Sequence, residues 1–457
     1  MLASLQVVLL TGLGPIFHSG ELPYQLLGVA LLLGHALGYR LPLRALAPLA
    51  LLCSWTPAAL LFLRGAGPED PERNSLPLLL LGLLLAILAT AALARMTVYW
   101  WQQLNGRREE LVRLYSLELA GSALGLCLAA LLGPLGNLRF FAWLCVWAFA
   151  SRPRLAGLCA LGALAQSLWI PRWMLENAAR VHRPGRVLEA SFSPYQLVEA
   201  VEMDGQRFLY LNGLCHHNPG VLQALNYYLS VLPSRVLPES ARSQGALVLG
   251  GGALLSAAET RKAGLDTTVL ELDPEVLRIS QEYFAPQFGL NPQDPQLHLI
   301  CNDARWSLRA PRKYGLIVFS LPYPYALNVA SLFSRESFAQ LRSKLAPGGI
   351  LTVFLGAPRS RRDQLDPMAC SILRGVREVF PHTLGISSQE MYNTVLLCRA
   401  DQPLDKDLLA RTCLADGYRR FHFVLPGQQD ALSRNTAPLS LWDLSPCARL
   451  NWNLWRD

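Results

Sequence analysis

The pattern of apolar and polar positions changes near residue 170. Before that point the apolar runs are long and the charges sparse, whereas afterwards short strand-type runs alternate with helical segments. A helix that crosses a lipid bilayer needs about 20 apolar residues, and residues 76–94 form an uncharged run of this kind. The pattern predicts a transmembrane domain over residues 1–171 and a globular region after it.

Six or seven spans are predicted in the apolar half. Besides 76–94, the candidate runs are residues 1–17, 26–39, 45–63, 119–138, 140–150 and 155–170. Arginines flank several of these runs, which indicates a multi-pass protein of the cell inner membrane. If all seven segments cross, the arginine-bearing loops and the C-terminal half lie on opposite sides, whereas Arg172, Arg180 and Arg183 favour a cytoplasmic C-terminal domain, so the charges leave the orientation open. Glu118 is the only acid inside an apolar run. A carboxylate at membrane depth is a candidate for function, although this one lies near the start of its run and could sit at the interface.

The second half predicts two further domains and an extension. Residues 186–235 read as a small β/α subdomain, in which short strands flank Asp204-Gly205, a favourable hairpin turn, and a helix follows at 219–232. Residues 245–400 read as a Rossmann-like nucleoside-binding domain. Residues 401–457 form an extension with no predicted elements.

Strands alternate with helices through the Rossmann-like domain. The predicted strands are 246–250, 267–273, 296–303, 314–322 and 348–356, with helices at 254–263, from 274, at 334–346 and at 367–379, and closing runs at 382–388 and 391–399. Such alternation predicts a parallel, doubly wound α/β sheet that binds its ligand at the carboxyl ends of the strands.

The composition of the chain indicates which classes of binding partner to expect. The chain has 457 residues and is 52% hydrophobic but only 16% charged, against about 25% charged in an ordinary soluble domain. Its net charge of +8 comes with arginines beside the apolar runs, so it favours membrane lipid over nucleic acid, for which no basic stripe with interleaved aromatics is present. The ten cysteines include no CxxC pair, which predicts reduced cysteines and no metal site.

Three signals indicate a nucleotide-type ligand. The loop of Gly250, Gly251 and Gly252 follows the first predicted strand, and glycines let a ligand approach the backbone closely. Glu271 ends the second strand, where an acid can accept hydrogen bonds from both ribose hydroxyls. Asp303 ends the third strand, within reach of an adenine amino group. No phosphate-binding lysine follows the loop, which favours a nucleoside such as S-adenosylmethionine over ATP.

Several short motifs resemble one known family. They are "SPYQ" at 193–196, "LYLNG" at 209–213, "LVLGGG" at 247–252, "LELDP" at 270–274 and "NDA" at 302–304. In these the chain resembles the bacterial membrane-fused spermidine synthases, a type of polyamine aminopropyltransferase. The resemblance implies the fold shared by spermidine synthases and S-adenosylmethionine-dependent methyltransferases.

The resemblance also implies site residues. Members of this family bind decarboxylated S-adenosylmethionine and transfer its aminopropyl group to putrescine. The matching nucleoside-binding positions, beside the three glycines, are Gln196, Glu271, Asp303 and Ala304. The sequence departs from the family where acids act on the amines: Ala253 replaces the acid after the glycines, and Ser320 and Tyr323 stand at the two aspartates after the fourth strand. The chain therefore resembles a divergent member of this family that lacks the usual catalytic aspartates.

The resemblance also implies a substrate pocket. Tyr195, His216, Ala253 and Tyr325 fall in its neighbourhood. Tyr195, Tyr323 and Tyr325 could together stabilise a sulfonium by cation–π attraction, about 0.5–2 kcal/mol each; the alternative is that these rings simply pack.

Several functions stay open at this stage. The first is an alkyl or aminopropyl transferase of altered chemistry with a small amine or another acceptor, or a methyltransferase. The second is an inactive pseudoenzyme that senses a nucleoside or scaffolds the membrane domain, and the third is a solute transporter with a regulatory domain. The predicted ligand is S-adenosylmethionine, its decarboxylated form or methylthioadenosine, and a homo-oligomer is compatible with each reading.

Overall fold

The computed structural model describes residues 21–42, 76–103, 153–309, 311–324, 327–355, 367–388, 393–424 and 436–440, together with isolated positions between 48 and 59, between 116 and 146, and at 427. The chain divides into two compact units. The first comprises Met1–Asp204 and Tyr210–Cys215, and the second comprises Gly205–Leu209 and His216–Asp457. The domain limits read from the sequence stay predictions.

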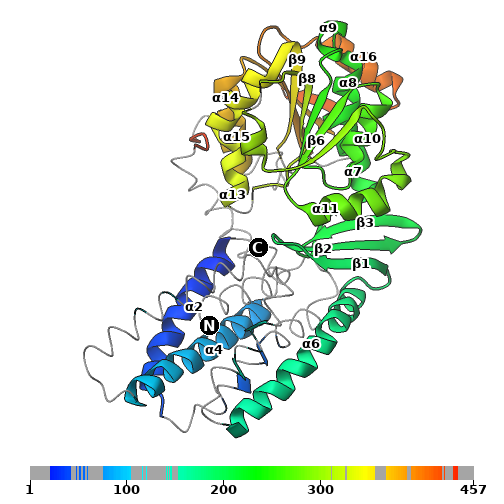
Figure 1. Cartoon of the computed structure of the whole chain (residues 1–457). Coiled ribbons are helices and arrows are strands. Elements are labelled where there is room, and N and C mark those ends of the chain that lie inside the picture. The colour runs from blue at the N-terminus through cyan, green and yellow to red at the C-terminus, as the bar shows by residue number, and fades with distance from the viewer. Residues whose placement is uncertain are drawn as a thin grey trace. The chain divides into compact units, whose positions relative to one another are not determined.

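Three long helices belong to the first unit: α2 (Glu21–Arg40), α4 (Leu76–Gln103) and α6 (Pro153–Val181) (Figure 1). Within the described part of the chain, one stretch, Leu80–Tyr99 of α4, has the length and apolar composition to cross a bilayer. The apolar stretch Leu26–Arg40 of α2 is shorter. Most of the other predicted spans, and Glu118 with them, lie outside the described residues, so the multi-span domain stays a prediction.

Helices α2 and α4 pack closely because small residues line their contact. A Cβ on Gly34 would lie 2.5 Å from the carbonyl oxygen of Ile87, and one on Gly38 would collide with the carbonyl of Ala91. Glycines four residues apart allow this approach of two backbones. On the same helix α2, Leu32 is 74% exposed. One face of α2 therefore packs against α4, while apolar side chains on another face are exposed.

A four-stranded sheet follows α6. Its strands are β1 (Arg186–Phe192), β2 (Leu197–Met203), β3 (Gln206–Leu211) and β4 (Leu214–His217), in the order β1-β2-β3-β4, and β1 and β2 are antiparallel. The predicted turn is confirmed: Asp204 and Gly205 both have positive φ angles, 51° and 73°, as a tight two-residue hairpin turn requires.

An eight-stranded sheet forms the centre of the second unit, in the order β12-β10-β11-β9-β8-β5-β6-β7. Its strands are β5 (Ala246–Leu249), β6 (Thr267–Glu271), β7 (Leu297–Cys301), β8 (Tyr314–Phe319), β9 (Leu345–Phe354), β10 (His382–Ser388), β11 (Asn393–Arg399) and β12 (Phe421–Val424). The predicted α/β alternation is confirmed, and β5, β6, β7, β8 and β9 pair in parallel.

The sheet differs from the prediction at one side. Strand β11 is antiparallel to β9 and to β10, and β10 is antiparallel to β12. Strand β12 and helix α16 (Lys406–Ala415) come from the extension for which the sequence predicted no elements.

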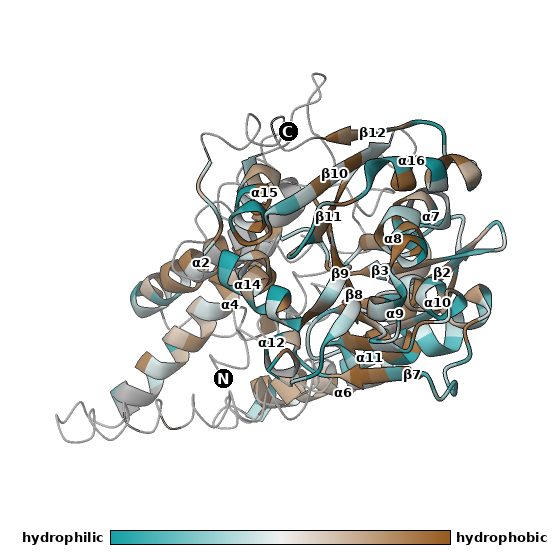
Figure 2. Ribbon diagram, turned by 90° about the horizontal axis from the view of Figure 1, so that it is seen from above, coloured by the Kyte–Doolittle hydropathy of each residue, from teal (hydrophilic) through white to brown (hydrophobic). Residues whose placement is uncertain are grey.

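Helices cover both faces of this sheet. They are α7 (Pro219–Asn226), α8 (Leu232–Val236), α9 (Glu239–Arg242), α10 (Leu255–Lys262), α11 (Pro274–Ile279), α12 (Ala304–Ser307), α13 (Leu327–Ala330), α14 (Arg335–Lys344), α15 (Pro367–Val379) and α16. Helices α14 and α15 lie on one side and α8 and α10 on the other (Figure 1). Seen from above, α10 and α16 show both hydrophilic and hydrophobic segments (Figure 2), as expected of helices with one face in solvent.

Strand β5 shows how the two layers are filled. All four of its residues are buried. Val248 belongs to the apolar cluster of α10 and the π-helical turn η2 (Tyr227–Val231), whereas Leu247 and Leu249 belong to the cluster of α14 and α15. Successive side chains of a strand point to opposite faces, so a strand buried on both faces reads as a continuous apolar run.

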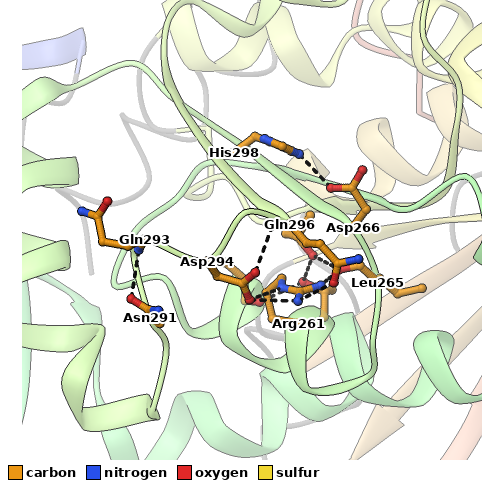
Figure 3. A network of polar contacts seen from close by, with 11 residues as sticks. Arg261, Leu265, Asp266, Asn291, Gln293, Asp294, Gln296 and His298 are labelled. Atoms are coloured by element: carbon orange, nitrogen blue, oxygen red, sulfur yellow. Dashed lines mark hydrogen bonds and ion pairs between the residues drawn. The ribbon is translucent and has the colours of Figure 1, made fainter.

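A polar network holds the amino-terminal edge of the parallel strands (Figure 3). Arg261 at the end of α10 donates to Asp294 (3.0 Å), to Gln296 (2.8 Å) and to the carbonyl of Leu265 (2.5 Å). These contacts connect the end of α10 to the segments that precede β6 and β7. The opposite edge, where those strands end, carries the predicted site.

Candidate functional site

The glycine loop passes between the ends of β6 and β8. Gly250 has a φ of +83°, and a Cβ there would lie 2.6 Å from the carbonyl oxygen of Ser320. A Cβ on Gly251 would lie 3.3 Å from the Cβ of Glu271. Glycine at 250 is therefore required both by its backbone conformation and by the space between neighbouring strand ends.

The loop enters α10 through an unusual residue. Leu254 has a φ of +64° and is fully buried. A left-handed conformation costs a residue with a Cβ about 1–2 kcal/mol. The Leu254 N–H donates to the carbonyl of Gly251 (2.8 Å), and the Leu254 carbonyl accepts the first α10 bond from Ala258 (2.9 Å).

Glu271 binds the loop directly. Its Oε2 accepts from the N–H groups of Gly251 (2.8 Å) and Gly252 (3.4 Å), and its Oε1 accepts from the N–H of Asp273 (3.0 Å). Burial raises the pKa of this carboxyl, and the three N–H donors oppose that rise. The sequence predicted Glu271 as an acceptor for ribose hydroxyls, a role that stays a prediction, whereas in the structure its carboxylate accepts from the glycine loop itself.

Asp303 lies at the next strand end but has a different partner. The guanidinium of Arg305 donates to both of its oxygens, with the shortest contact 2.5 Å. These hydrogen bonds lower the pKa of Asp303. The Arg305 side chain is 54% exposed, so the acid is held by a residue with one side in solvent.

The strand ends bring these residues together. The N–H of Asn302, the residue before Asp303, donates to the Glu271 carbonyl (2.9 Å), which ties the end of β7 to the end of β6. Ala304, predicted beside Asp303, begins α12. Gly250, Gly251, Gly252, Glu271 and Asp303 therefore share one edge of one sheet.

The positions of the family's acids lie on the other half of this edge. Ser320 follows β8, and its N–H donates to the carbonyl of Leu249 (2.9 Å). Tyr323 packs against the apolar cluster of α14 and α15, the packing alternative to a cation–π role. Ala253 is buried at 6% exposure. Among the described residues, no group of three His, Cys, Asp or Glu side chains could hold a metal ion.

The remaining predicted residues come from other segments of the chain. Tyr195, 53% exposed, and Gln196 belong to the first unit, where the Ser193 hydroxyl accepts from both of their N–H groups. Their roles stay predictions. Burial lowers the pKa of His216 to about 4, so this side chain is neutral at pH 7. Tyr325 lies outside the described residues.

A cavity of about 580 Å³ lies elsewhere in the second unit. It is lined by Gln206, His217, Pro219, Gln223, Asn226, Tyr227, Val231, Arg235, Leu255, Glu259, Lys262, Gln287, Phe288, Asp416 and Tyr418. None of the predicted site residues is among them. The predicted site is therefore an arrangement at the sheet edge and not this cavity.

Two contacts at the site were missed from the sequence. Arg305 stands two residues after Asp303, a spacing visible in "NDAR". Ser280, whose hydroxyl donates to the carbonyl of Gly252 (2.6 Å), lies 28 residues from the loop, and no sequence pattern announces that contact.

Comparison with known proteins identifies the type of domain. Residues 228–385 match the family model of the spermine/spermidine synthase domain. This region contains the glycine loop, Glu271, Asp303, Ser320 and Tyr323, so the likeness to spermidine synthases is confirmed for this domain. The motifs at 193–196 and 209–213 lie outside the matched region, and the likeness to the membrane-fused type stays a prediction.

Curated relatives match part of the chain. The polyamine aminopropyltransferase of Corynebacterium efficiens is 33% identical over 172 residues, which are 36% of this chain and 32% of that protein. The polyamine aminopropyltransferase of Mycobacterium tuberculosis is 28% identical over 217 residues, 44% of this chain and 40% of that protein. The chain thus spans between about a third and two fifths of these relatives.

Solved structures show a more distant likeness. A spermidine synthase in complex with the transition-state analogue AdoDATO is 16% identical, with a TM-score of 0.45, over 55% of this chain and 88% of that one. Human methyltransferase-like protein 13 in complex with SAH is 19% identical, with a TM-score of 0.33, over 51% of this chain and 99% of that one.

Proposed function

We propose that this protein is a membrane-bound, spermidine synthase-like transferase that binds a sulfur-containing adenosine nucleoside and carries out altered chemistry. The observation that carries the proposal is the contact of the Glu271 carboxylate with the amides of Gly251 and Gly252, inside the region that matches the spermine/spermidine synthase domain. Decarboxylated S-adenosylmethionine, S-adenosylmethionine and methylthioadenosine share the adenosine that this edge would hold.

The two retained acids divide the recognition of the nucleoside. Each Glu271 oxygen already accepts backbone N–H groups and keeps lone-pair capacity for a ribose hydroxyl. Asp303 would accept a hydrogen bond from the adenine amino group once Arg305 releases one of the two Asp303 carboxylate oxygens. Gln196 is proposed, from the sequence motif alone, as a contact of the ribose or the thioether.

The reacting end of the site argues for altered chemistry. In aminopropyl transfer the amine nitrogen forms a bond to the carbon beside the sulfonium, the carbon–sulfur bond breaks, and a thioether leaves. The amine must lose a proton, which a carboxylate can accept, and carboxylates also offset the cost of burying ammonium groups. Ala253, Ser320 and Tyr323 offer no carboxylate, so we expect poor turnover of putrescine.

Methyl transfer is the second candidate, favoured by the same three positions. S-adenosylmethionine carries its own methyl electrophile. Orientation of the two reactants supplies a large part of the rate, so the reaction can proceed without an aspartate base. A small amine or another nucleophile would be the acceptor.

The membrane part of the proposal rests on α4 and on the apolar runs of the first 171 residues. We propose a multi-pass inner-membrane protein with a cytoplasmic C-terminal domain. Retention of the full chain in membranes after alkaline carbonate washing, and its release by detergent, would support this. Release by carbonate alone would contradict it.

One experiment separates the candidate functions. Detergent-solubilised protein is titrated with S-adenosylmethionine, its decarboxylated form and methylthioadenosine, with small amines as acceptors, and the products are read by mass spectrometry. Methylthioadenosine release with an alkylated acceptor supports an alkyl or aminopropyl transferase, and S-adenosylhomocysteine supports a methyltransferase. Binding without product indicates a pseudoenzyme. Absence of binding refutes the proposal and leaves solute transport, measured as flux into vesicles.

A further inference from the structure

Ser280 binds a carbonyl group of the glycine loop, whereas Glu271 binds N–H groups of the same loop. It is fully buried, and its hydroxyl donates to the carbonyl oxygen of Gly252 at 2.6 Å. A serine inside a helix commonly returns its hydroxyl to a carbonyl of its own preceding turn. Here the bond instead crosses to a loop 28 residues earlier in the chain.

The local helix geometry accompanies this contact. Ser280 begins the π-helical turn η3 (Ser280–Phe284), which directly continues α11, and the N–H of Ala285 closes the wide turn on the carbonyl of Ser280 (2.8 Å). Such π turns interrupt a helix rarely, and they occur frequently at functional sites.

The consequence falls on one peptide unit. A peptide group is planar and trans, so holding the Gly252 carbonyl toward Ser280 points the N–H of Ala253 the other way. Over the described part of the chain, no protein acceptor meets that N–H, and Ala253 is buried. Buried N–H groups are nearly always paired with something.

Glu271 completes the pattern by occupying the two preceding amides. The N–H groups of Gly251 and Gly252 donate to its carboxylate. The Ala253 N–H is then the loop amide that remains for a ligand. An N–H donates to an anionic oxygen, whereas it offers nothing to an ammonium group.

We infer that Ser280 is a positioning residue that fixes the Gly252–Ala253 peptide so that the Ala253 N–H binds the carboxylate of a nucleoside's amino-acid tail. The inference rests on the proposed function and names its ligand class: a carboxylate-bearing sulfur nucleoside of the S-adenosylmethionine type. Alanine at 253, in place of an acid, removes the group that would repel this carboxylate.

The test compares two nucleosides that differ in the tail. S-adenosylhomocysteine carries the carboxylate, and methylthioadenosine lacks the amino-acid tail. We expect Ser280→Ala in the full-length, detergent-solubilised chain to weaken S-adenosylhomocysteine binding about tenfold, because a buried, charge-assisted contact loses its alignment. Methylthioadenosine binding should change less than about twofold.

Ser234→Ala is the matched control. Its buried hydroxyl donates to the carbonyl of Ser230 at the same distance, 2.6 Å, so it reports the cost of losing such a bond away from the loop. It should leave both affinities unchanged. Ser280→Cys keeps a side chain of similar size with a weaker donor, so its affinity for S-adenosylhomocysteine should lie between those of wild type and Ser280→Ala. This variant replaces Ser280→Ala in the test if the alanine variant does not fold.

The outcomes are distinct. Wild-type protein that binds neither nucleoside overturns both the proposed function and this inference. Wild-type binding with unchanged S-adenosylhomocysteine affinity in the Ser280 variants overturns the inference alone, and so does an equal loss for both nucleosides.

Discussion

The carboxyl edge of the eight-stranded sheet has two halves with different chemistry. Strands β6 and β7 end at Glu271 and Asp303, whose oxygens are all engaged by N–H groups or a guanidinium. Strands β5 and β8 lead into Ala253 and Ser320, which carry no charge. The first half offers oxygen acceptors for the hydroxyl and amino groups of the proposed nucleoside, whereas Ala253 and Ser320 offer no carboxylate to accept a proton from an amine. The proposed binding and the proposed reaction therefore depend on different residues.

The largest expected effect comes from breaking the first half. Glu271→Ala removes the acceptor of three backbone N–H groups and the proposed ribose contact. Hydrogen bonds to a charged group are worth about 1.5–3 kcal/mol each, so we expect nucleoside affinity to fall by about 100-fold or more and the melting temperature to drop. Calorimetric titration and thermal unfolding measure both.

Glu271→Gln is the shape-preserving control for that variant. It retains an acceptor oxygen for the loop and should lose less affinity than the alanine. Nucleoside affinity equal to wild type in Glu271→Ala would refute the site.

Restoring acids tests the second half. We expect Ser320→Asp with Tyr323→Asp to change putrescine turnover by less than about twofold while Ala253 remains. Adding Ala253→Asp should raise turnover by about tenfold or more, a modest part of what a placed acid or base supplies. Mass spectrometry of spermidine formation is the measurement. Ready spermidine formation by the native chain would contradict the comparison between the two halves.

A smaller effect is expected at Asp303. Arg305→Ala frees the carboxylate from a half-exposed ion pair, and such pairs contribute about 0–1 kcal/mol. We therefore expect affinity for the adenosine nucleoside to rise about two- to threefold in a titration. Arg278→Ala, which removes another exposed arginine bonded to Glu275 and Glu282, should have no such effect. Weaker binding by Arg305→Ala would mean that the guanidinium itself contacts the ligand.

The finest distinction between the two acids is the sign of their pH dependence. Burial raises the pKa of Glu271 above its ordinary 4.5, so the stability it contributes is greatest below pH 4.5 and is lost as the pH rises through the folded value. Arg305 lowers the pKa of Asp303 below 3.8, so its contribution is present above that pH and is lost as the pH falls through the folded value.

Unfolding curves over a pH series measure this. Relative to wild type, Glu271→Gln should gain stability as the pH rises from 4.5 toward neutrality. Asp303→Asn should be relatively more stable only as the pH falls below 3.8. Parallel curves for the two variants would show that the acids do not differ in environment.

Most of the strands and helices of the second unit could be predicted from the sequence. Strand β5 could be predicted because its buried residues form one apolar run. Glu271 could be singled out because it is the acid at the end of the next such run. The runs that form β10 and β11 were predicted from the sequence, but their antiparallel direction was not, and β12 was missed altogether, since strand direction depends on how the connections return to the sheet. The bond from Ser280 to Gly252 and the capture of Asp303 by Arg305 depend on packing and rotamers, which periodicity does not encode.

Leu254 places two opposing demands on a single position. Its backbone would relax if a glycine stood there, yet its fully buried side chain belongs to the apolar cluster beneath α10. A glycine would remove about 1.5–3 kcal/mol of burial to relieve about 1–2 kcal/mol of strain. Leucine at 254 therefore balances these two free-energy terms where the loop meets the helix. Substitutions that stabilise this chain are expected at other positions.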